Sequence, residues 1–143
     1  MKAITLWQPW ATLIACGAKH YETRSWPTSY RGPIAIHAAT KPAPKTFSTI
    51  IPYETSKAMF EHLMPLGIYF PADLPHGAIV ATAELVNCVP TGRKPGPGFQ
   101  ERQFGDWTPG RYAWELANVK MLPKPIPAKG AQGLWDWNGP THL

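Results

Sequence analysis

The sequence predicts an α+β fold in one domain that spans all 143 residues. Several runs alternate polar and apolar residues or are rich in Val, Ile and Ala, which is typical of strands. Two other runs carry apolar residues at helical spacing and have helix-stopping residues beside them. The expected strands cover residues 2–7, 20–25, 31–39, 77–89, 111–119 and 134–137.

A short buried helix is expected between the first two strands. Pro9 suits the first turn of a helix, because its missing N–H has no intrahelical partner there. Leu13 and Ile14 supply apolar side chains for the next turns. Gly17 follows where a left-handed residue would end the helix.

Charged residues mark the strand that follows this helix. Because alternate side chains of a strand share a face, Glu22 and Arg24 should point the same way, with Lys19 just before them. Three tryptophans bracket these charges: Trp7, Trp10 and Trp26. The pattern fits a binding or catalytic site, and it also fits the solvent side of an edge strand, where ion pairs contribute little to stability.

The middle of the chain looks like additions to a β core. Residues 40–75 are broken by prolines and contain a predicted helix near 53–63, so we expect a helical insertion packed on the side of the sheet. The run 77–89 is the longest β signal. Residues 90–110 are so rich in Pro and Gly that we expect a loop without long elements.

Four ordered motifs resemble the ASCH domain family. The family signature Gly-x-Lys-x-x-E/T-x-R is present as Gly17, Lys19, Glu22 and Arg24, after a QPW start at residues 8–10. The other matches are GAIVATAEL at 77–85, FGDWTPGRYAWEL at 104–116 and PIPAKGAQGLWDW at 125–137. The resemblance implies a small β-barrel of about five or six strands, similar to the PUA domain, flanked by two or three short helices.

The first functional expectation is a domain that binds RNA or a modified nucleoside or nucleotide in a basic cleft. Arginine suits phosphate and carbonyl oxygens, a neutral histidine offers one donor and one acceptor, and tryptophan can stack a base. We expect the cleft to lie between the charged strand and the Gly-rich turn near residues 128–133. The candidate ligand-binding residues are Trp7, Gln8, Trp10, Arg24, Trp26, His37, Arg111, Tyr112, Lys129 and Gln132.

The second expectation is an enzyme. A characterised group that the motif resembles hydrolyses the acetyl amide of N4-acetylcytidine with a Lys, a Thr and a Glu. Lys19 matches the Lys and Glu101 the Glu, but Glu22 stands where that group carries Thr. Glu22 would then activate water while Lys19 or Arg24 stabilises the oxyanion. The resemblance also leaves open a metal-independent ribonuclease and a partner-binding module.

Composition limits the remaining classes. A net charge of +5 and a predicted pI near 9.4 suit an anionic partner. Cys16 and Cys88 lie in apolar surroundings, which predicts reduced thiols, and no group of residues has metal-ligand spacing, so we expect no metal or other cofactor. The sequence shows neither a signal peptide nor a run long enough to span a membrane, so we expect a cytoplasmic protein. It leaves the oligomeric state open, with a monomer favoured.

Overall fold

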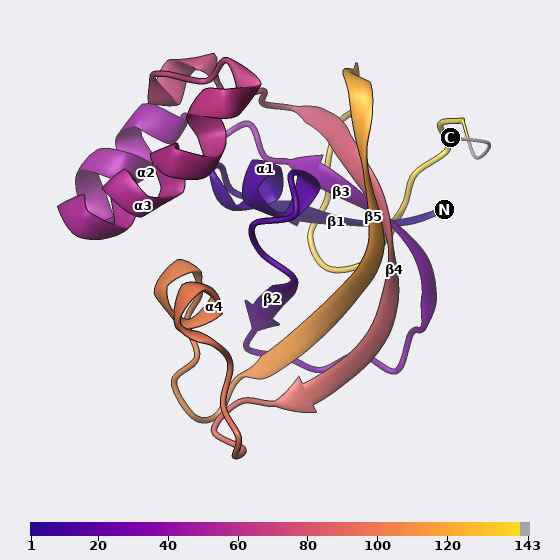
Figure 1. Cartoon of the computed structure of the whole chain (residues 1–143). Coiled ribbons are helices and arrows are strands. Elements are labelled where there is room, and N and C mark those ends of the chain that lie inside the picture. The colour runs from indigo at the N-terminus through magenta and orange to yellow at the C-terminus, as the bar shows by residue number, and fades with distance from the viewer. Residues whose placement is uncertain (141–143) are drawn as a thin grey trace.

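Residues 1–140, which the computed structural model describes, form one strongly curved sheet of six strands (Figure 1). The strand order is β2-β5-β4-β3-β1-β6; β1 and β3 pair in parallel and the other neighbours are antiparallel. The strands are β1 (Lys2–Leu6), β2 (Tyr21–Arg24), β3 (Gly32–Ala38), β4 (Ala78–Pro90), β5 (Tyr112–Pro127) and β6 (Trp135–Asp136). Each expected strand is therefore present.

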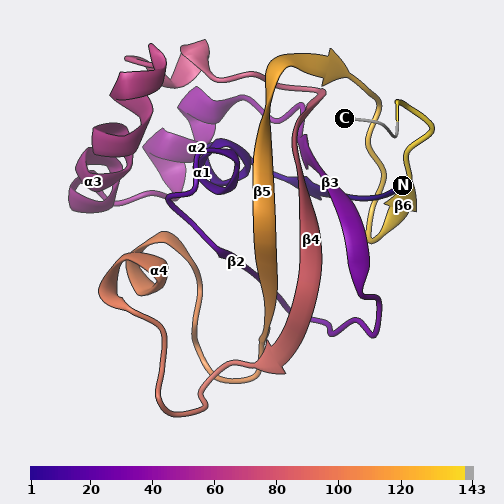
Figure 2. The same ribbon diagram turned by 45° about the vertical axis from the view of Figure 1, so that its right-hand side comes forward.

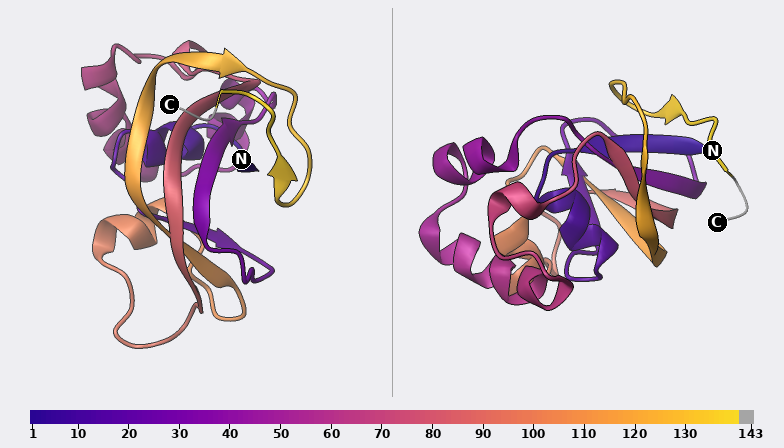
Figure 3. Two further views of the ribbon diagram at one scale, coloured as in Figure 1. Left: turned by 90° about the vertical axis from the view of Figure 1, so that its right-hand side faces the viewer. Right: turned by 90° about the horizontal axis from the view of Figure 1, so that it is seen from above.

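Four α-helices lie on the concave side of this sheet in the described part of the chain, as the views in Figures 2 and 3 show. They are α1 (Trp10–Ala15), α2 (Ala43–Thr49), α3 (Tyr53–Leu63) and α4 (Phe99–Phe104). Two 3-10 turns, η1 (Met64–Leu66) and η2 (Pro71–Asp73), lead from α3 back to the sheet. The helix α1 sits inside the curve, and α2 and α3 stand beside it.

The α+β class is confirmed, with two differences from the expected barrel. The sheet stays open, because β2 and β6 form its two edges and each pairs with one neighbour only in the described residues. There are also more helices than the two or three expected, since α2 and α4 both form in stretches rich in Pro or Gly. Pro44 lies in the first turn of α2, where proline is tolerated, and α4 fits between Gly98 and Gly105.

The strand β5 extends well beyond the expected residues 111–119. It pairs with β4 as far as Pro127, but with β2 only between Tyr112 and Glu115. Among the described residues, the rest of β5 therefore pairs with a strand on one side only. The prolines at 123, 125 and 127 lie in this part, where only one row of hydrogen bonds between strands has to form.

Two apolar clusters hold the site in place. One packs Ile14 and Ala15 of α1 against the inner face of the sheet around Trp114. The other joins Leu13, on the opposite side of α1, to the insertion and to Phe104 of α4. The helix α1 is thus buried on both sides, and Gly17 ends it with φ at +85° as the sequence predicted.

Candidate functional site

A cleft of about 600 Å³ opens where α3 and α4 face each other across the start of α1 and strand β2. Its floor comes from the end of β1 and from Glu22, Thr23 and Arg24 of β2. One wall comes from the loop before α3 and from α3 itself, and the other from residues 103–106, at the end of α4 and just after it. Lys19, Arg24 and Arg111 line it together with the carboxylates of Glu22 and Asp106, so cations are in excess.

Lys19 is the most deeply buried charged group of this cleft. Its side chain is 1 % exposed, and its ammonium donates a hydrogen bond to the carbonyl oxygen of Tyr21. Burial lowers the pKa of Lys19 below its ordinary value, while the nearby carboxylates of Glu22 and Glu101 act against that shift. An amine held in this way can donate or release a proton more readily than a surface lysine.

Glu22 and Arg24 share one face of β2, as their spacing predicted. Arg24 Nε lies 3.1 Å from Glu22 Oε2, and Arg24 Nη2 donates to the carbonyl oxygen of Thr5 at 2.6 Å. Within residues 1–140, Arg24 Nε is buried and has no partner that is aligned for a hydrogen bond. The guanidinium is thus fixed at one end and retains a donor.

Arg111, just before β5, is anchored in the same manner. Its Nη2 donates to the carbonyl oxygen of Thr23 at 3.0 Å, and its Nε lies 3.5 Å from Asp106 Oδ2. That Nε is also buried without an aligned hydrogen-bond partner in the described residues. Thr108 and Arg111 hold the pKa of the Asp106 carboxyl below its usual range, so this group stays charged. Two anchored guanidiniums therefore line one cleft.

Glu101 lies behind the cleft and is absent from its lining. Its Oε2 accepts a hydrogen bond from the backbone N–H of His20 at 2.5 Å. Its Oε1 is buried and has no hydrogen-bond partner among residues 1–140. The carboxylate is near enough to Lys19 to influence its pKa, so Lys19 and the two predicted glutamates form one group, with Glu22 on the cleft side.

Two of the predicted tryptophans line the cleft. Trp7 is 44 % exposed at its mouth, and the ammonium of Lys41 lies 3.6 Å from the centre of its ring. Trp10 is half-buried and packs against the core clusters on both sides of α1. An exposed ring beside cations is the kind of surface on which a base stacks.

Gln8 and His37 do not join the cleft, because both side chains find partners inside the protein. Gln8 is fully buried and accepts from the N–H of Thr12 at 3.0 Å. Its amide nitrogen donates to Thr12 Oγ1 at 2.7 Å and to the carbonyl oxygen of Pro75 at 2.9 Å. The ring nitrogens of His37 contact Thr5 Oγ1 at 3.1 Å and the carbonyl oxygen of Ala128 at 2.7 Å.

The remaining predicted binding residues also lie elsewhere. Trp26 packs edge-on against Trp114, with ring centres 4.8 Å apart, and Tyr112 packs against the same core cluster. Lys129 and Gln132 are exposed on a turn that contacts His37 instead of the cleft. The expectation that this turn faces Lys19, Glu22 and Arg24 is corrected: α3 and the segment after α4 take that place.

The buried hydrogen bonds of Gln8 lead to a stability prediction. Gln8→Ala should lower the free energy of unfolding by about 2–4 kcal/mol, because it leaves the N–H of Thr12 and the carbonyl of Pro75 without partners in the core. Urea unfolding measures this difference. Gln132→Ala is the matched control, since Gln132 is exposed and should change stability by less than about 0.5 kcal/mol. Equal stability of the two variants would contradict the prediction.

The sequence did not predict that the insertion and α4 form the walls of the cleft. Ile51 and Met59 supply its apolar surface, and Asp106 supplies a carboxylate opposite Arg111. Alternation within a strand can group residues that are close in sequence, but it cannot show which distant helix stands opposite them. The sequence offered one signal, the FGDW motif, which places Asp106 close along the chain to residues already named as candidates.

No set of three His, Cys, Asp or Glu side chains among residues 1–140 is arranged to hold a metal ion. None of the helices in this part of the chain combines the length and hydropathy needed to cross a membrane. Cys16 and Cys88 are both free thiols, as expected.

Comparison with known proteins agrees with the four motifs. The profile of the ASCH domain matches residues 4–126. Activating signal cointegrator 1 from Homo sapiens and from Mus musculus are each 29 % identical to the chain over 97 % of its length. The chain spans 22 % of the length of these relatives. A crystal structure of a mutant ASCH protein from Zymomonas mobilis matches with a TM-score of 0.50 at 20 % identity, over 88 % of this chain and 74 % of that one. The last likeness concerns the PUA-like fold alone.

Proposed function

Because the chain belongs to the ASCH domain family, and because two anchored arginines line its cleft, we propose that it binds RNA by holding one nucleotide in that cleft. The observation that carries the proposal is the pair of guanidiniums of Arg24 and Arg111, which both line the cleft and are each anchored to a backbone carbonyl oxygen through Nη2. A guanidinium that is already held in place loses little conformational freedom on binding, so its remaining N–H groups suit an anionic or carbonyl oxygen.

The other groups of the cleft suit the rest of a nucleotide. Glu22 can accept a hydrogen bond from an exocyclic amino group, and Trp7 offers an exposed ring for stacking. A volume of about 600 Å³ lies within the range of small-molecule pockets and leaves room for one base with its sugar and phosphate. A base of a single strand can rotate out of the strand and enter such a pocket, whereas the bases of a duplex stay stacked and paired.

Trp7 gives a direct test of this proposal. Trp7→Ala should weaken binding of cytidine 5′-monophosphate by about tenfold, because stacking of one base on an aromatic ring contributes about 1–3 kcal/mol. Isothermal titration of the nucleotide measures the loss. Phe99→Ala is the matched control, since Phe99 is an exposed aromatic side chain outside the cleft lining. The proposal fails if the wild-type protein binds neither mononucleotides nor single-stranded RNA.

Amide hydrolysis is a second candidate, supported by the burial of Lys19 between Glu22 and Glu101. Glu22 would take a proton from water as the hydroxide adds to the acetyl carbonyl of N4-acetylcytidine. The Lys19 ammonium would stabilise the oxyanion and then give a proton to the departing amino group, which releases cytidine and acetate. A lowered pKa makes this ammonium the stronger acid that the last step needs.

A further inference from the structure

A second hollow of about 780 Å³ lies on the other side of α4 from the cleft. It is bounded by the end of β4, by the Pro-rich loop that follows, and by the segment after α4. Three cationic side chains line it: Arg93, Lys94 and Arg102. Its one lining carboxylate within residues 1–140 is Asp106, which already lies beside Arg111 and accepts hydrogen bonds from Thr108.

The two hollows meet at Gly105 and Asp106, which line both of them. A methyl group added to Gly105 would lie 3.4 Å from Lys19 Nζ and 3.2 Å from Trp107 Nε1. Lys19 belongs to the cleft and Trp107 to the second hollow. Gly105 therefore stands between Lys19 and Trp107 without a side chain of its own, and a ligand that passes over it would touch both hollows.

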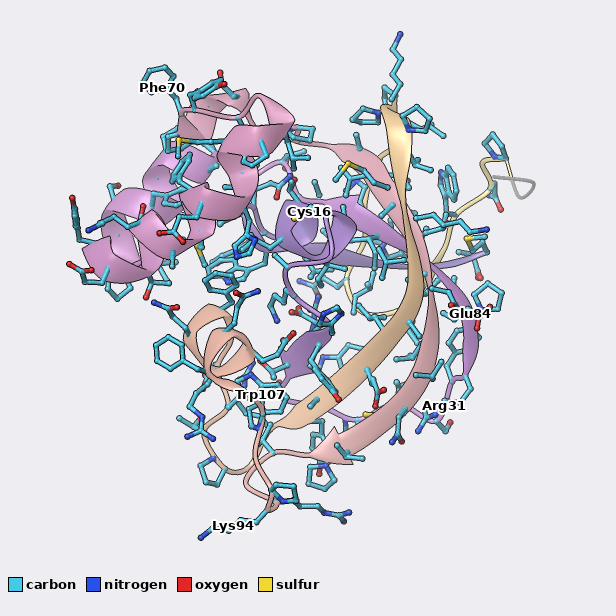
Figure 4. The ribbon with its side chains drawn as sticks, in the orientation of Figure 1. Cys16, Arg31, Phe70, Glu84, Lys94 and Trp107 are labelled. Atoms are coloured by element: carbon cyan, nitrogen blue, oxygen red, sulfur yellow. The ribbon has the colours of Figure 1, made fainter. Side chains whose placement is uncertain are left out.

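The second hollow also offers flat surfaces and a fixed cation. Trp107 is held by a hydrogen bond from its Nε1 to the carbonyl oxygen of Glu101 at 2.9 Å, and it packs edge-on against Tyr21. Arg102 Nη2 lies 3.5 Å from the carbonyl oxygen of Pro97, over the bare backbone of Gly96. Figure 4 shows Trp107 beside β2 and Lys94 at the tip of the loop, directed toward solvent.

We propose that this hollow binds the sugar-phosphate backbone of the nucleotide next to the one in the cleft, so that the ligand is a single RNA strand and not a free nucleoside. The inference rests on the proposed function of the cleft. Cations without paired carboxylates attract a phosphodiester, and Trp107 can stack the neighbouring base. Two adjoining hollows of this kind form one continuous binding surface, which a polymer can occupy in full and a free nucleoside cannot.

The test compares the salt dependence of RNA binding in two variants of equal charge. Arg93→Gln/Lys94→Gln/Arg102→Gln removes the cations of the second hollow, whereas Arg31→Gln/Lys120→Gln/Lys124→Gln removes three exposed cations outside both hollows. Fluorescence anisotropy with a labelled single-stranded RNA of about ten nucleotides gives the dissociation constant at several salt concentrations. Cytidine 5′-monophosphate serves as the probe of the cleft alone.

We expect the first variant to bind the RNA at least about tenfold more weakly, and its plot of log affinity against log salt to be shallower by about 2, or roughly 0.7 for each lost phosphate contact. Its affinity for cytidine 5′-monophosphate should not change. The control variant should lose less than about threefold. The inference is overturned if both variants lose RNA affinity equally, or if neither does.

Two further outcomes separate this inference from the proposed function. If the wild-type protein binds the mononucleotide and the RNA with equal affinity, the cleft binds a nucleotide but the second hollow plays no part. If it binds neither probe, both proposals fail. Arg93→Gln/Lys94→Gln leaves the contact of Arg102 with Pro97 intact, so a loss of RNA affinity in this variant as well shows that the effect does not come from a collapsed loop.

Discussion

Arg24→Gln/Arg111→Gln should remove the preference of the protein for cytidine 5′-monophosphate over cytidine. We expect the wild-type protein to bind the nucleotide more tightly, because both guanidiniums line the cleft and each is held in place through its Nη2. A hydrogen bond to a charged group contributes about 1.5–3 kcal/mol, so each arginine accounts for roughly tenfold or more in affinity. Isothermal titration with both ligands measures the difference.

The matched control for this pair is Arg31→Gln. Arg31 is also fixed by backbone carbonyls, those of Thr28 and Tyr30, but it is exposed and lies away from the cleft (Figure 4). The Arg31→Gln variant should leave the affinities for cytidine 5′-monophosphate and for cytidine unchanged. A double variant that folds and still prefers the nucleotide as strongly as the wild-type protein would show that the arginines do not hold the phosphate.

Arg24→Lys separates charge from geometry at the same position. A lysine keeps the positive charge but lacks the planar guanidinium, which binds the carbonyl oxygen of Thr5 through Nη2 and keeps further N–H groups for a ligand. We therefore expect this variant to retain only part of the preference for the nucleotide. Thermal unfolding of each variant reports whether the loss of the bond to Thr5 has changed the fold itself.

Local rules predicted the parts of this site that are close in sequence. The alternation of β2 placed Glu22 and Arg24 on one face, and their side chains do form an ion pair. Gly17 ended α1 for the stated reason, and Glu84, the one charged residue of the apolar first half of β4, is exposed on the outer face of the sheet (Figure 4). Periodicity succeeds here because it depends on neighbours along one element.

The same rules could not tell binding side chains from buried polar ones. Gln8 and Lys19 are polar and buried to a similar degree, yet Gln8 has three hydrogen bonds inside the protein whereas Lys19 lines the cleft. The difference depends on whether a distant backbone group, such as the carbonyl of Pro75, lies within reach. Such contacts between remote residues are fixed by the packing of α1 against the insertion. The residue pattern within a single helix or strand carries no information about that packing.

Lys19→Met is expected to reduce the release of acetate from N4-acetylcytidine by at least about 100-fold, if the cleft hydrolyses this amide. The variant loses both the cation beside the oxyanion and the acid that protonates the departing amine. Chromatography of free N4-acetylcytidine and of acetylated RNA measures the products, and the length of the recovered RNA reports ribonuclease activity in the same samples. Lys124→Met, on an exposed stretch of β5, is the matched control.

The direction of the Lys19 pKa shift also predicts how turnover depends on pH. Because the ammonium must be present, the rate should fall as the pH rises through the lowered pKa of Lys19, and so at a pH below 10.5, the ordinary value for lysine. A rate that keeps rising throughout this range would contradict the assigned role. The absence of turnover in the wild-type protein, with RNA binding retained, would leave a cleft that binds a nucleotide without changing it.

Stability tests the burial of Lys19 independently of any activity. Between the lowered pKa of the folded state and 10.5, the unfolded chain binds more protons at Lys19 than the folded chain does. The free energy of unfolding of the wild-type protein should therefore rise with pH over this interval relative to that of Lys19→Met, which has no such group. Urea unfolding at a series of pH values measures the difference. If the two proteins change in parallel, the ammonium is not held in the desolvated state that the cleft imposes, and its part in acid catalysis loses its physical basis.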